Sequence, residues 1–385
     1  MGFVSNFREI TFDDILLLPN FSSFSQNEEE KEISLKTRIS KNLFLDLPII
    51  SSPMPAVTNS DMAISLAKAG GFGIIHPFQS LSDQINEIRK VKKLNLKVGI
   101  GVSDLSIRGL ENIGLLLKEG VDLISLEVPH AHTREVINFI KLVKKKYPTT
   151  NLNVSSIITP EAVKDIIKAG ADSIRIGIGG GSHCTTRIVT GIGRPQLSAL
   201  DDCSKVARRY NIPVILDGGI RNSGDITKAI AFGANAVMIG GLFSGTDESP
   251  GELVIKNKKK YKYSWGMSTK KAVDSLNNHS PKKYTMSNFR KFLKLFFQNP
   301  ISSIKKTFRY LFFRDNFDAD NSFLEEGIGN YIPYKGSVSN ILAQLKGGIF
   351  RSFFYLGARN LEEVKKKSKK VLISNRSYLE NIPRI

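Results

Sequence analysis

Cysteine is scarce in this sequence, whose 385 residues include only two, Cys184 and Cys203. Two cysteines are too few for a disulfide framework, and the N-terminal stretch lacks the charged and apolar regions of a signal peptide. We therefore expect a protein of a reducing compartment, the cytoplasm. The sequence also lacks an early G-x-G-x-x-G turn between a strand and a helix, which disfavours a doubly wound dinucleotide-binding sheet.

Acidic residues are in deficit, with 36 against 55 basic residues and a formal net charge of +19. None lies between His279 and Arg314, so much of the excess belongs to one segment. Two stretches there, "NFRKFLKLFF" and "ISSIKKTFRYLFF", have the pattern of basic amphipathic helices, for which packing over the protein is the ordinary outcome and membrane contact the alternative. The remaining charge indicates a solvated basic surface that favours anionic ligands such as nucleotides. We expect neither a nucleic-acid partner nor membrane contact.

Short β-branched runs alternate with amphipathic stretches over residues 48–240. Several of the amphipathic stretches open on Ser, Thr or Asn, which cap helices, and close on Gly. Eight strand–helix units predict an α/β fold, a (β/α)8 TIM barrel whose active site lies on the loops after the strands. The predicted strands are "PIIS" (48–51), "FGIIH" (72–76), "KVGIGV" (97–102), "DLISLE" (122–127), "NVSS" (153–156), "SIRIGI" (173–178), "PVILD" (213–217) and "AVMIG" (236–240).

Polar or glycine-rich segments follow six of these strands. A barrel brings all such segments to one end, where a shared site explains them better than six unrelated turns do. They are "SSPMPAVT" after the first strand, His76 after the second, "EVPHAH" after the fourth, "GGGSHCTTR" after the sixth, "DGGIRNSGD" after the seventh and "GGLFSGTDESPGE" after the eighth.

Cys184 stands in the glycine-rich stretch "GIGGGSHCTTR" (177–187). Glycines let a backbone approach a ligand closely, and free N–H groups together with Ser182 suit a phosphate or a cation held by carbonyl oxygens. The same N–H dipoles favour a thiolate, so we expect Cys184 to be a nucleophile beside a bound nucleotide monophosphate. Cys203 lies in a helical pattern and is interpreted as a small buried hydrophobic residue.

Long motifs of the sequence resemble those of the IMP dehydrogenase and GMP reductase family. They cover nearly the whole chain apart from about 269–323. The resemblance implies a (β/α)8 barrel, usually a homotetramer, that acts on purine nucleotide monophosphates with a nicotinamide cofactor. The motifs are "TFDDILLLPN" (11–20), "GSHCTTRIVTGIGRPQLSAL" (181–200), "DGGIRNSGDITKAIAFGANAVMIG" (217–240), "GTDESPGE" (245–252), "EGIGNYIPYKG" (326–336) and "LKGGIFRSFFYLGA" (345–358).

The resemblance also implies roles for individual residues. Cys184 would attack carbon 2 of the purine, with Thr186 beside the resulting thioimidate, while the pair Arg309 and Tyr310 would activate water. The positions that match substrate contacts are Ser52, Ser182, Asp217, Gly219, Gly240, Gly241, Met267 and Glu326, with Tyr263 as a substitute for a phosphate-binding tyrosine that aligns with Ser264. The positions on the cofactor side are Glu127, Asn153, Gly177 and Gly179, and the carbonyl groups of Gly179, Gly181 and Cys184 match a potassium site.

By this resemblance the chain has three parts. Residues 1–268 form the catalytic barrel with its eight strands, 269–323 form a basic, aromatic-rich flap insertion, and 324–385 return to the barrel and end in a tail. The family often inserts a paired CBS regulatory module before the third strand, but here "EIRKVKKLNLKVGIGV" (87–102) runs straight through. We therefore expect a member that lacks this module.

Three functions remain open at this point. Oxidation of IMP to XMP with NAD is favoured by "CTTRIVTG", "TDESPGE", "EGIGNYIPYKG" and the Arg–Tyr pair. Reduction of GMP to IMP with NADPH is favoured by "YSWGMSTKKAV", "IHPF" and "MIGG". A purine-nucleotide-binding protein without turnover is permitted by the departures at Pro55, Glu127 and His183, but it has no need of a thiol nucleophile. The cysteine loop and the Arg–Tyr pair would act on the reacting atoms themselves, so the sequence favours the dehydrogenase.

Overall fold

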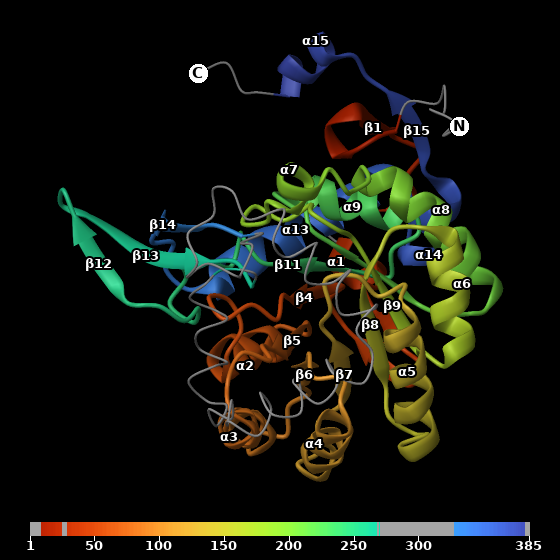
Figure 1. Ribbon diagram of the computed structural model, residues 1–385. Coiled ribbons are helices and arrows are strands. Elements are labelled where there is room, and N and C mark those ends of the chain that lie inside the picture. Colours follow the sequence, from red (N-terminus) through yellow and green to blue (C-terminus); the bar gives the residue numbers. More distant parts are fainter. Residues whose placement is uncertain (1–8, 25–28, 268, 270–326, 382–385) are drawn as a thin grey trace, which may run out of the picture.

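The computed structural model describes residues 9–24, 29–267, 269 and 327–381. Eight parallel strands close into a barrel in the order β10-β11-β4-β5-β6-β7-β8-β9 (Figure 1). The closed barrel confirms the predicted fold. Seven strands fall within their predicted runs, and β8 extends one residue beyond its run at each end. The strands are β4 (Ile49–Ser51), β5 (Phe72–Ile75), β6 (Gly99–Val102), β7 (Leu123–Leu126), β8 (Leu152–Ile157), β9 (Ser173–Ile176), β10 (Val214–Asp217) and β11 (Ala236–Ile239).

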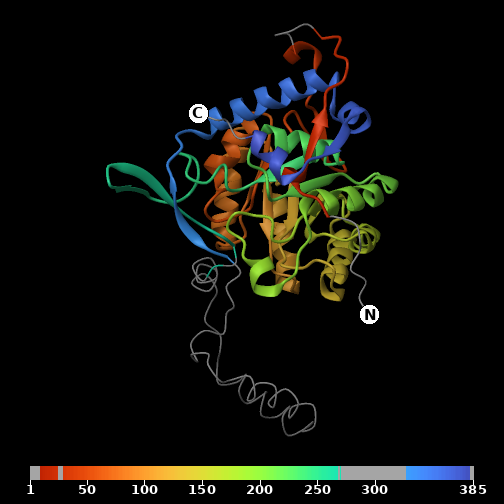
Figure 2. The same cartoon turned by 90° about the horizontal axis from the view of Figure 1, so that it is seen from above.

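Eight helices surround the barrel as an outer ring (Figures 1 and 2). They are α2 (Ser60–Lys68), α3 (Leu81–Lys92), α4 (Ile107–Lys118), α5 (Arg134–Lys146), α6 (Pro160–Ala169), α8 (Gln196–Arg209), α9 (Ser223–Ala231) and α13 (Val338–Leu356). Seven of them begin at a Ser, Thr or Asn whose side chain accepts a backbone N–H of the first turn, as the cap pattern predicts. Helix α8 is the exception, because Pro195 precedes it.

The barrel interior is apolar at one end and polar at the other. A hairpin of β2 (Thr37–Ser40) and β3 (Leu43–Leu45) closes the end where the strands begin. Its buried Ile39, Leu43 and Leu45 pack against interior residues such as Phe72 and Met238. Each such side chain contributes roughly 1.5–3 kcal/mol by its burial. The polar end, where the strands finish, is therefore the end left open for a site.

Two small antiparallel sheets extend the barrel. Strands β12 (Leu253–Lys256), β13 (Lys259–Trp265) and β14 (Gly329–Pro333) form an arm that projects from one side (Figure 1), and β1 (Ile15–Leu18) pairs with β15 (Lys369–Leu372). The remaining short elements are η1 (Phe12–Asp14), α1 (Glu29–Glu32), α7 (Thr186–Thr190), α14 (Leu361–Lys367), α15 (Asn375–Tyr378) and η2 (Leu379–Asn381). The predicted flap insertion, 269–323, lies outside the described residues except for Thr269.

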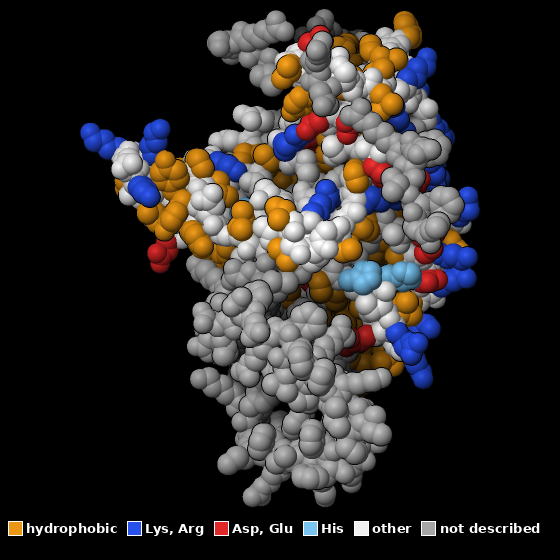
Figure 3. Space-filling model, turned by 45° about the horizontal axis from the view of Figure 1, so that its top comes forward, with side chains coloured by type: hydrophobic (Ala, Val, Ile, Leu, Met, Phe, Trp, Pro, Cys, Tyr) orange, Lys and Arg blue, Asp and Glu red, His pale blue; other side chains and the backbone are white. Residues whose placement is uncertain are grey.

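Residues 93–98 alone connect α3 to β6, so the chain carries no module at the place where the family often inserts one. Within the ranges given above, no helix is both long and apolar enough to cross a membrane. On the face shown in Figure 3, basic side chains are interspersed with acidic ones, and several gather at the tip of the projecting arm. That tip contains Lys258, Lys259 and Lys260, which are exposed.

Candidate active site at the carboxyl end of the barrel

The predicted nucleophile lies on an open loop after β9. Cys184 is exposed, and a hydrogen bond of 3.1 Å joins its Sγ to Oγ1 of Thr186, the first residue of α7. The backbone N–H of Cys184 donates to the carbonyl oxygen of Gly181 at 3.1 Å, which closes a tight turn in front of the thiol. The structure thus brings together the two residues expected to form and surround the covalent bond.

The glycines of this loop allow it to pack against the protein itself. Gly177 has φ +144°, and a Cβ at this position would collide with the carbonyl oxygen of Asp217. A Cβ on Gly180 would lie 2.8–2.9 Å from the amide group of Gln196. That amide in turn donates to the carbonyl oxygens of Asp217 at 2.5 Å and Gly218 at 3.1 Å. Gln196, the first residue of α8, therefore ties the thiol loop to the end of β10.

Arg187 holds the other side of the loop. Its Nε donates to the carbonyl oxygen of Ile178 at 3.1 Å, and its Nη2 donates to the carbonyl oxygen of Arg194 at 2.6 Å and to Gln196 Oε1 at 3.2 Å. Burial lowers the pKa of Arg187, while the nearby thiol of Cys184 acts in the opposite direction. Arg187 therefore ties Ile178, before the thiol, to Arg194 and Gln196, after it.

Four predicted substrate residues converge beside this loop. A Cβ on Gly241 would lie 2.7 Å from Ser182 Oγ, and one on Gly240 would lie 3.5 Å from Cβ of Ser52. Lys335, in the segment after β14, donates to the carbonyl oxygens of Gly241 at 2.8 Å and Leu242 at 3.0 Å. Two hydroxyl groups, two glycines and a cation at one place form a suitable environment for a phosphate.

His183 lies buried between these residues and the thiol. Its Nδ1 is 3.2 Å from Ser182 Oγ. Burial lowers the pKa of His183, and the positive charge of Lys335 lowers it further. The imidazole is therefore neutral near pH 7, which leaves it able to accept or donate a hydrogen bond to Ser182 without adding charge.

A charged network fills the polar end of the barrel. Arg175 of β9 makes a bidentate ion pair with Glu127, with distances of 2.8 and 2.5 Å, and its Nε lies 3.1 Å from Asp217 Oδ2. Burial raises the pKa of Asp217, Arg175 opposes the rise, and Glu127 adds to it. For Arg175, the two carboxylates outweigh burial and raise its pKa. Arg175 thus lies between two carboxylates, the buried one of Glu127 and the partly exposed one of Asp217.

The two predicted cofactor residues on β7 and β8 belong to this interior network. Asn153 is fully buried; its Oδ1 accepts from Ser125 at 2.9 Å, and its Nδ2 donates to Ser173 at 3.0 Å. Ser125 also donates to Glu127 at 2.7 Å. Both amide atoms of Asn153 and the carboxylate of Glu127 are thus already engaged by the barrel wall. Gly177 and Gly179, also predicted on the cofactor side, lie half-buried on the loop.

The segments that precede and follow the predicted insertion lie together at the thiol loop. Gly327 forms an antiparallel bridge with Cys184, and the N–H of Ile328 donates to the carbonyl oxygen of His183 at 3.0 Å. Gly266, beside the predicted base contact Met267, donates to the carbonyl oxygen of Ile328 at 3.2 Å. Of the remaining predicted residues, Arg309, Tyr310 and Glu326 lie outside the described residues.

The structure does not bring Tyr263 to this group. Its ring stacks on Trp265 at 5.8 Å and meets Tyr331 edge-on at 5.2 Å. Ser264 faces the opposite way and donates to Ser244 at 3.1 Å, because successive residues of a strand point to opposite faces. Gly219, which has φ +83°, packs under Phe12, where a Cβ would lie 3.0 Å from the ring.

Sequence reasoning did not assign a role to Arg175, Arg187, Gln196 or Lys335. A signal existed for Arg175, since a cation within an apolar strand such as "SIRIGI" needs buried partners. Gln196 and Lys335 make hydrogen bonds to carbonyl oxygens of distant loops, and such partners cannot be identified from their own sequence neighbourhood. Arg187 bonds to carbonyl oxygens nine and seven residues away, in a loop without a regular pattern.

The described residues define a (β/α)8 protein whose barrel carries, at its carboxyl end, a thiol and a group of residues suited to a phosphate. The chain belongs to the IMP dehydrogenase / GMP reductase family, whose domain profile matches residues 9–384. It is 36% identical to an inosine-5'-monophosphate dehydrogenase of Borreliella burgdorferi, with 97% of this chain and 96% of the relative covered. A protein of the same name from Cryptosporidium parvum is 35% identical, over 99% and 96%. The inosine-5'-monophosphate dehydrogenase of Methanocaldococcus jannaschii is 31% identical, with 98% of this chain and 95% of the relative covered. That alignment runs over 500 positions, so this chain of 385 residues is the shorter of the two.

Proposed function

We propose that this protein is an NAD-dependent oxidoreductase that converts IMP to XMP through a covalent bond to Cys184. The observation that carries the proposal is the exposed thiol, hydrogen-bonded to Thr186 on a loop whose Ser182 lies against Gly241. The relatives named above support the choice of IMP, since each is called an inosine-5'-monophosphate dehydrogenase.

In the proposed reaction the sulfur of Cys184 forms a bond to carbon 2 of the hypoxanthine ring, and the thiol proton is lost to solvent. When bound, the nicotinamide cofactor accepts the hydride that leaves carbon 2. The enzyme then holds a thioimidate, and water attacks the same carbon. Loss of the thiol from this adduct gives XMP and restores Cys184. The Thr186 hydroxyl, 3.1 Å from the sulfur, is placed to exchange a proton with these species.

The nucleotide would be oriented by groups on several barrel loops. The hydroxyl groups of Ser52 and Ser182, with the backbone around Gly240 and Gly241, would bind the phosphate, and the charge of Lys335 would stabilise it. Asp217 would accept hydrogen bonds from the ribose hydroxyls, with Gly219 in the adjoining turn. Its partner Arg175 favours the ionised carboxylate that this role needs. We exclude Tyr263 from the phosphate contacts.

Cys184 is exposed, which leaves room beside it for a cofactor and a cation. We propose that Gly177 and Gly179 line the cofactor, while Glu127 and Asn153 support the wall behind it. In the part of the chain that the structure describes, no three His, Cys, Asp or Glu side chains are grouped to bind a metal. A cation at this loop would therefore be held by the carbonyl oxygens of Gly179, Gly181 and Cys184, a donor type that suits potassium.

The predicted insertion would complete the site. Gly266 and Gly327, which precede and follow it, lie beside the thiol loop. We propose that Glu326 contacts the purine edge, that Met267 contacts the base and that Arg309 and Tyr310 activate the water of the second step. The exposed apolar side chains of α7 and the loop after it, Ile188 at 86% and Ile192 at 59%, support a subunit contact, which we propose belongs to a cytoplasmic homotetramer.

The test uses the two cysteines as a matched pair. Cys184 is exposed, whereas Cys203 is buried in α8, where burial raises its pKa to about 12. Purified wild type, Cys184→Ala and Cys203→Ala are mixed with IMP, NAD and potassium, and the absorbance of the reduced cofactor is followed. We expect Cys184→Ala alone to lose turnover and to lose covalent labelling by a chloropurine nucleotide.

A parallel assay with GMP and NADPH separates the alternatives. Consumption of NADPH with GMP, and no reduction of NAD with IMP, would replace the proposed activity by that of a GMP reductase. Binding of nucleotide without turnover in either assay, unchanged in Cys184→Ala, would indicate a binding protein and refute the covalent mechanism.

A further inference from the structure

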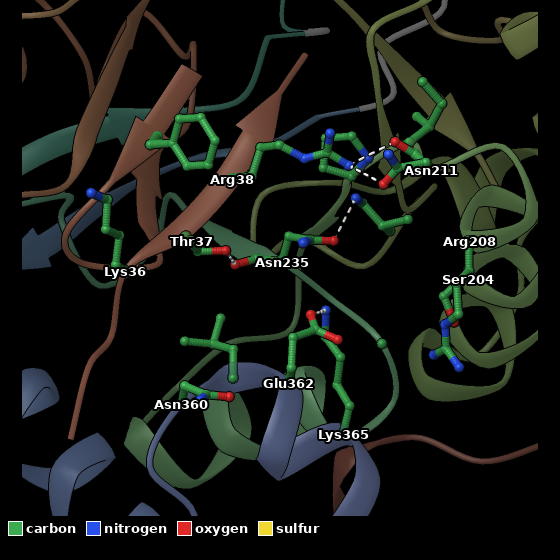
Figure 4. A pocket seen from close by; sticks show the side chains of 16 residues that line it. Lys36, Thr37, Arg38, Ser204, Arg208, Asn211, Asn235, Asn360, Glu362 and Lys365 are labelled. Atoms are coloured by element: carbon green, nitrogen blue, oxygen red, sulfur yellow. Dashed lines mark hydrogen bonds and ion pairs between the residues drawn. The ribbon is translucent and has the colours of Figure 1, made fainter. Parts of the chain in front are cut away.

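A cavity of about 560 Å3 lies at the opposite end of the barrel from Cys184 (Figure 4). Its walls come from the β2–β3 hairpin, the segments that lead into β10 and β11, the C-terminal end of α8, and α14. The proposed catalytic residues contribute nothing to it. Its volume falls within the roughly 300–1,000 Å3 typical of small-molecule sites.

Positive charge dominates the lining. Four basic side chains, Lys36, Arg38, Arg208 and Lys365, surround the cavity with a single acidic one, Glu362. The carboxylate of Glu362 pairs with Lys365 at 2.7 Å, but its side chain is 67% exposed, so it does little to neutralise the interior. The lining therefore carries an excess of positive charge that would favour an anion.

Two of these four basic side chains are held by hydrogen bonds or an ion pair, and the other two are not. The Nη2 of Arg38 donates to the carbonyl oxygen and to Oδ1 of Asn211, both at 2.7 Å, which holds its guanidinium at the cavity (Figure 4). Lys365 is held by Glu362. The side chains of Arg208 and Lys36 line the cavity without a hydrogen bond or ion pair to any residue within the described ranges. Two basic groups thus remain available to a ligand.

The protein relieves the mutual repulsion of these cations only in part. Burial lowers the pKa of Lys365; Glu362 opposes this, but Arg208 and Arg38 lower it further. Arg194, by contrast, is paired with two carboxylates, those of Glu9 and Asp202. Four basic side chains with one carboxylate among them would be stabilised by an external anion.

We propose that this cavity binds a small ligand through a polyphosphate group, either inorganic or part of a nucleotide. Several cations around one cavity match the several adjacent charges of such a group better than a single phosphate. The cavity is also larger than a polyphosphate needs, and Phe44, Ile212, Pro213 and Leu361 supply an apolar wall for an organic part. The site is separate from the proposed catalytic site and does not depend on it.

Neighbouring residues offer a matched control for the test. Arg209 and Lys366 are exposed and follow Arg208 and Lys365 in the chain, but they do not line the cavity. The variants Arg208→Gln/Lys365→Gln and Arg209→Gln/Lys366→Gln therefore lose the same charge, one pair inside the cavity and one outside it. Arg208→Gln alone is a second test, because this exposed side chain has no partner in the described ranges whose loss would affect folding.

Binding of inorganic tripolyphosphate and, separately, of ATP is measured by calorimetry on the full-length protein. We expect the cavity variant to weaken binding by about tenfold or more and the control variant by about twofold or less. Equal affinities for the two probes would indicate recognition of the polyphosphate alone, and tighter binding of ATP would show that the apolar wall contributes. No binding to the wild type at about 1 mM, or equal losses in both double variants, would overturn the proposal.

Discussion

Replacing Arg175 with Met should destabilise this protein more than any comparable change on its surface. Met has a similar length but no charge, so Arg175→Met leaves Glu127 and Asp217 without their cation. The side chains of Arg175 and Glu127 are only 3% and 4% exposed, and water cannot take the place of the lost partner. Removal of one member of a buried ion pair typically costs about 3–5 kcal/mol, and we expect a loss of that size in the free energy of unfolding.

The loss should depend on pH in a defined direction. Burial already raises the pKa of Asp217 above that of the unfolded chain, and Arg175 limits the rise. Without the arginine, the pKa of Asp217 rises further. A carboxyl group with a raised pKa in the folded state destabilises the fold at pH values above that pKa, because the unfolded chain then holds the charge more easily. The deficit of Arg175→Met should therefore be larger at pH 8 than at pH 5.

The assay is urea unfolding followed by the fluorescence of Trp265, the only tryptophan of the chain. Arg89→Met is the matched control, since Arg89 makes a similar bidentate pair with Glu119 at 2.7 and 2.8 Å, but its side chain is 56% exposed. An exposed pair contributes about 0–1 kcal/mol. Arg175→Met/Glu127→Gln should recover part of the lost stability, because it removes one uncompensated charge. Equal losses for Arg175→Met and Arg89→Met would refute the reasoning.

Three further predictions concern single residues. Thr186→Val removes the hydroxyl that hydrogen-bonds to the thiol, and we expect kcat to fall roughly a hundredfold while nucleotide affinity is kept, as steady-state kinetics and binding would show. Gly241→Ala would place a Cβ 2.7 Å from Ser182 Oγ, so KM for the nucleotide should rise about tenfold, whereas Gly347→Ala, with open space around it, should leave KM unchanged. Burial lowers the pKa of His76 to about 4, so the stability associated with the neutral ring is present above pH 6.5 and about 3 kcal/mol of it is lost as pH falls towards 4. The free energy of unfolding in urea is measured at pH 7 and at pH 4.5 for each protein. Between these two pH values it should fall clearly less for His76→Gln than for wild type, and an equal fall would contradict this account.

The barrel could be predicted from the sequence because its strands are buried on both faces. Such strands are continuous apolar runs, and all eight lie at the predicted runs, with β8 extending one residue beyond its run at each end. The arm of β12, β13 and β14 was not predicted. Its strands are partly exposed and rich in lysine, as in "KKYKYSW", and β14 comes from a segment more than sixty residues further along the chain. Pairing at that distance leaves no local pattern.

The side chains that face the barrel interior can also be predicted from the alternation along each strand. Alternate residues of a strand share a face, so the interior positions Leu123 and Ser125 of β7 place Glu127 inside as well. The same rule carries Ile215 of β10 to Asp217. Glu127 and Asp217 had been assigned to different ligands, whereas the structure joins them through Arg175.

The glycine loop shows why the site could be located from the sequence but its construction could not. From the sequence, glycines before a cysteine indicate that the backbone approaches a ligand closely. In the structure, Gly177 and Gly180 are needed because the carbonyl oxygen of Asp217 and the amide of Gln196 leave no room for a Cβ. The loop is thus pressed against β10 and α8, and this packing turns Cys184 outward to the open side. A Gly180→Ala variant should therefore disturb the thiol by shifting its support rather than by blocking a ligand: labelling of Cys184 should slow at every nucleotide concentration. Full labelling at saturating nucleotide would instead show that the missing Cβ makes room for the ligand.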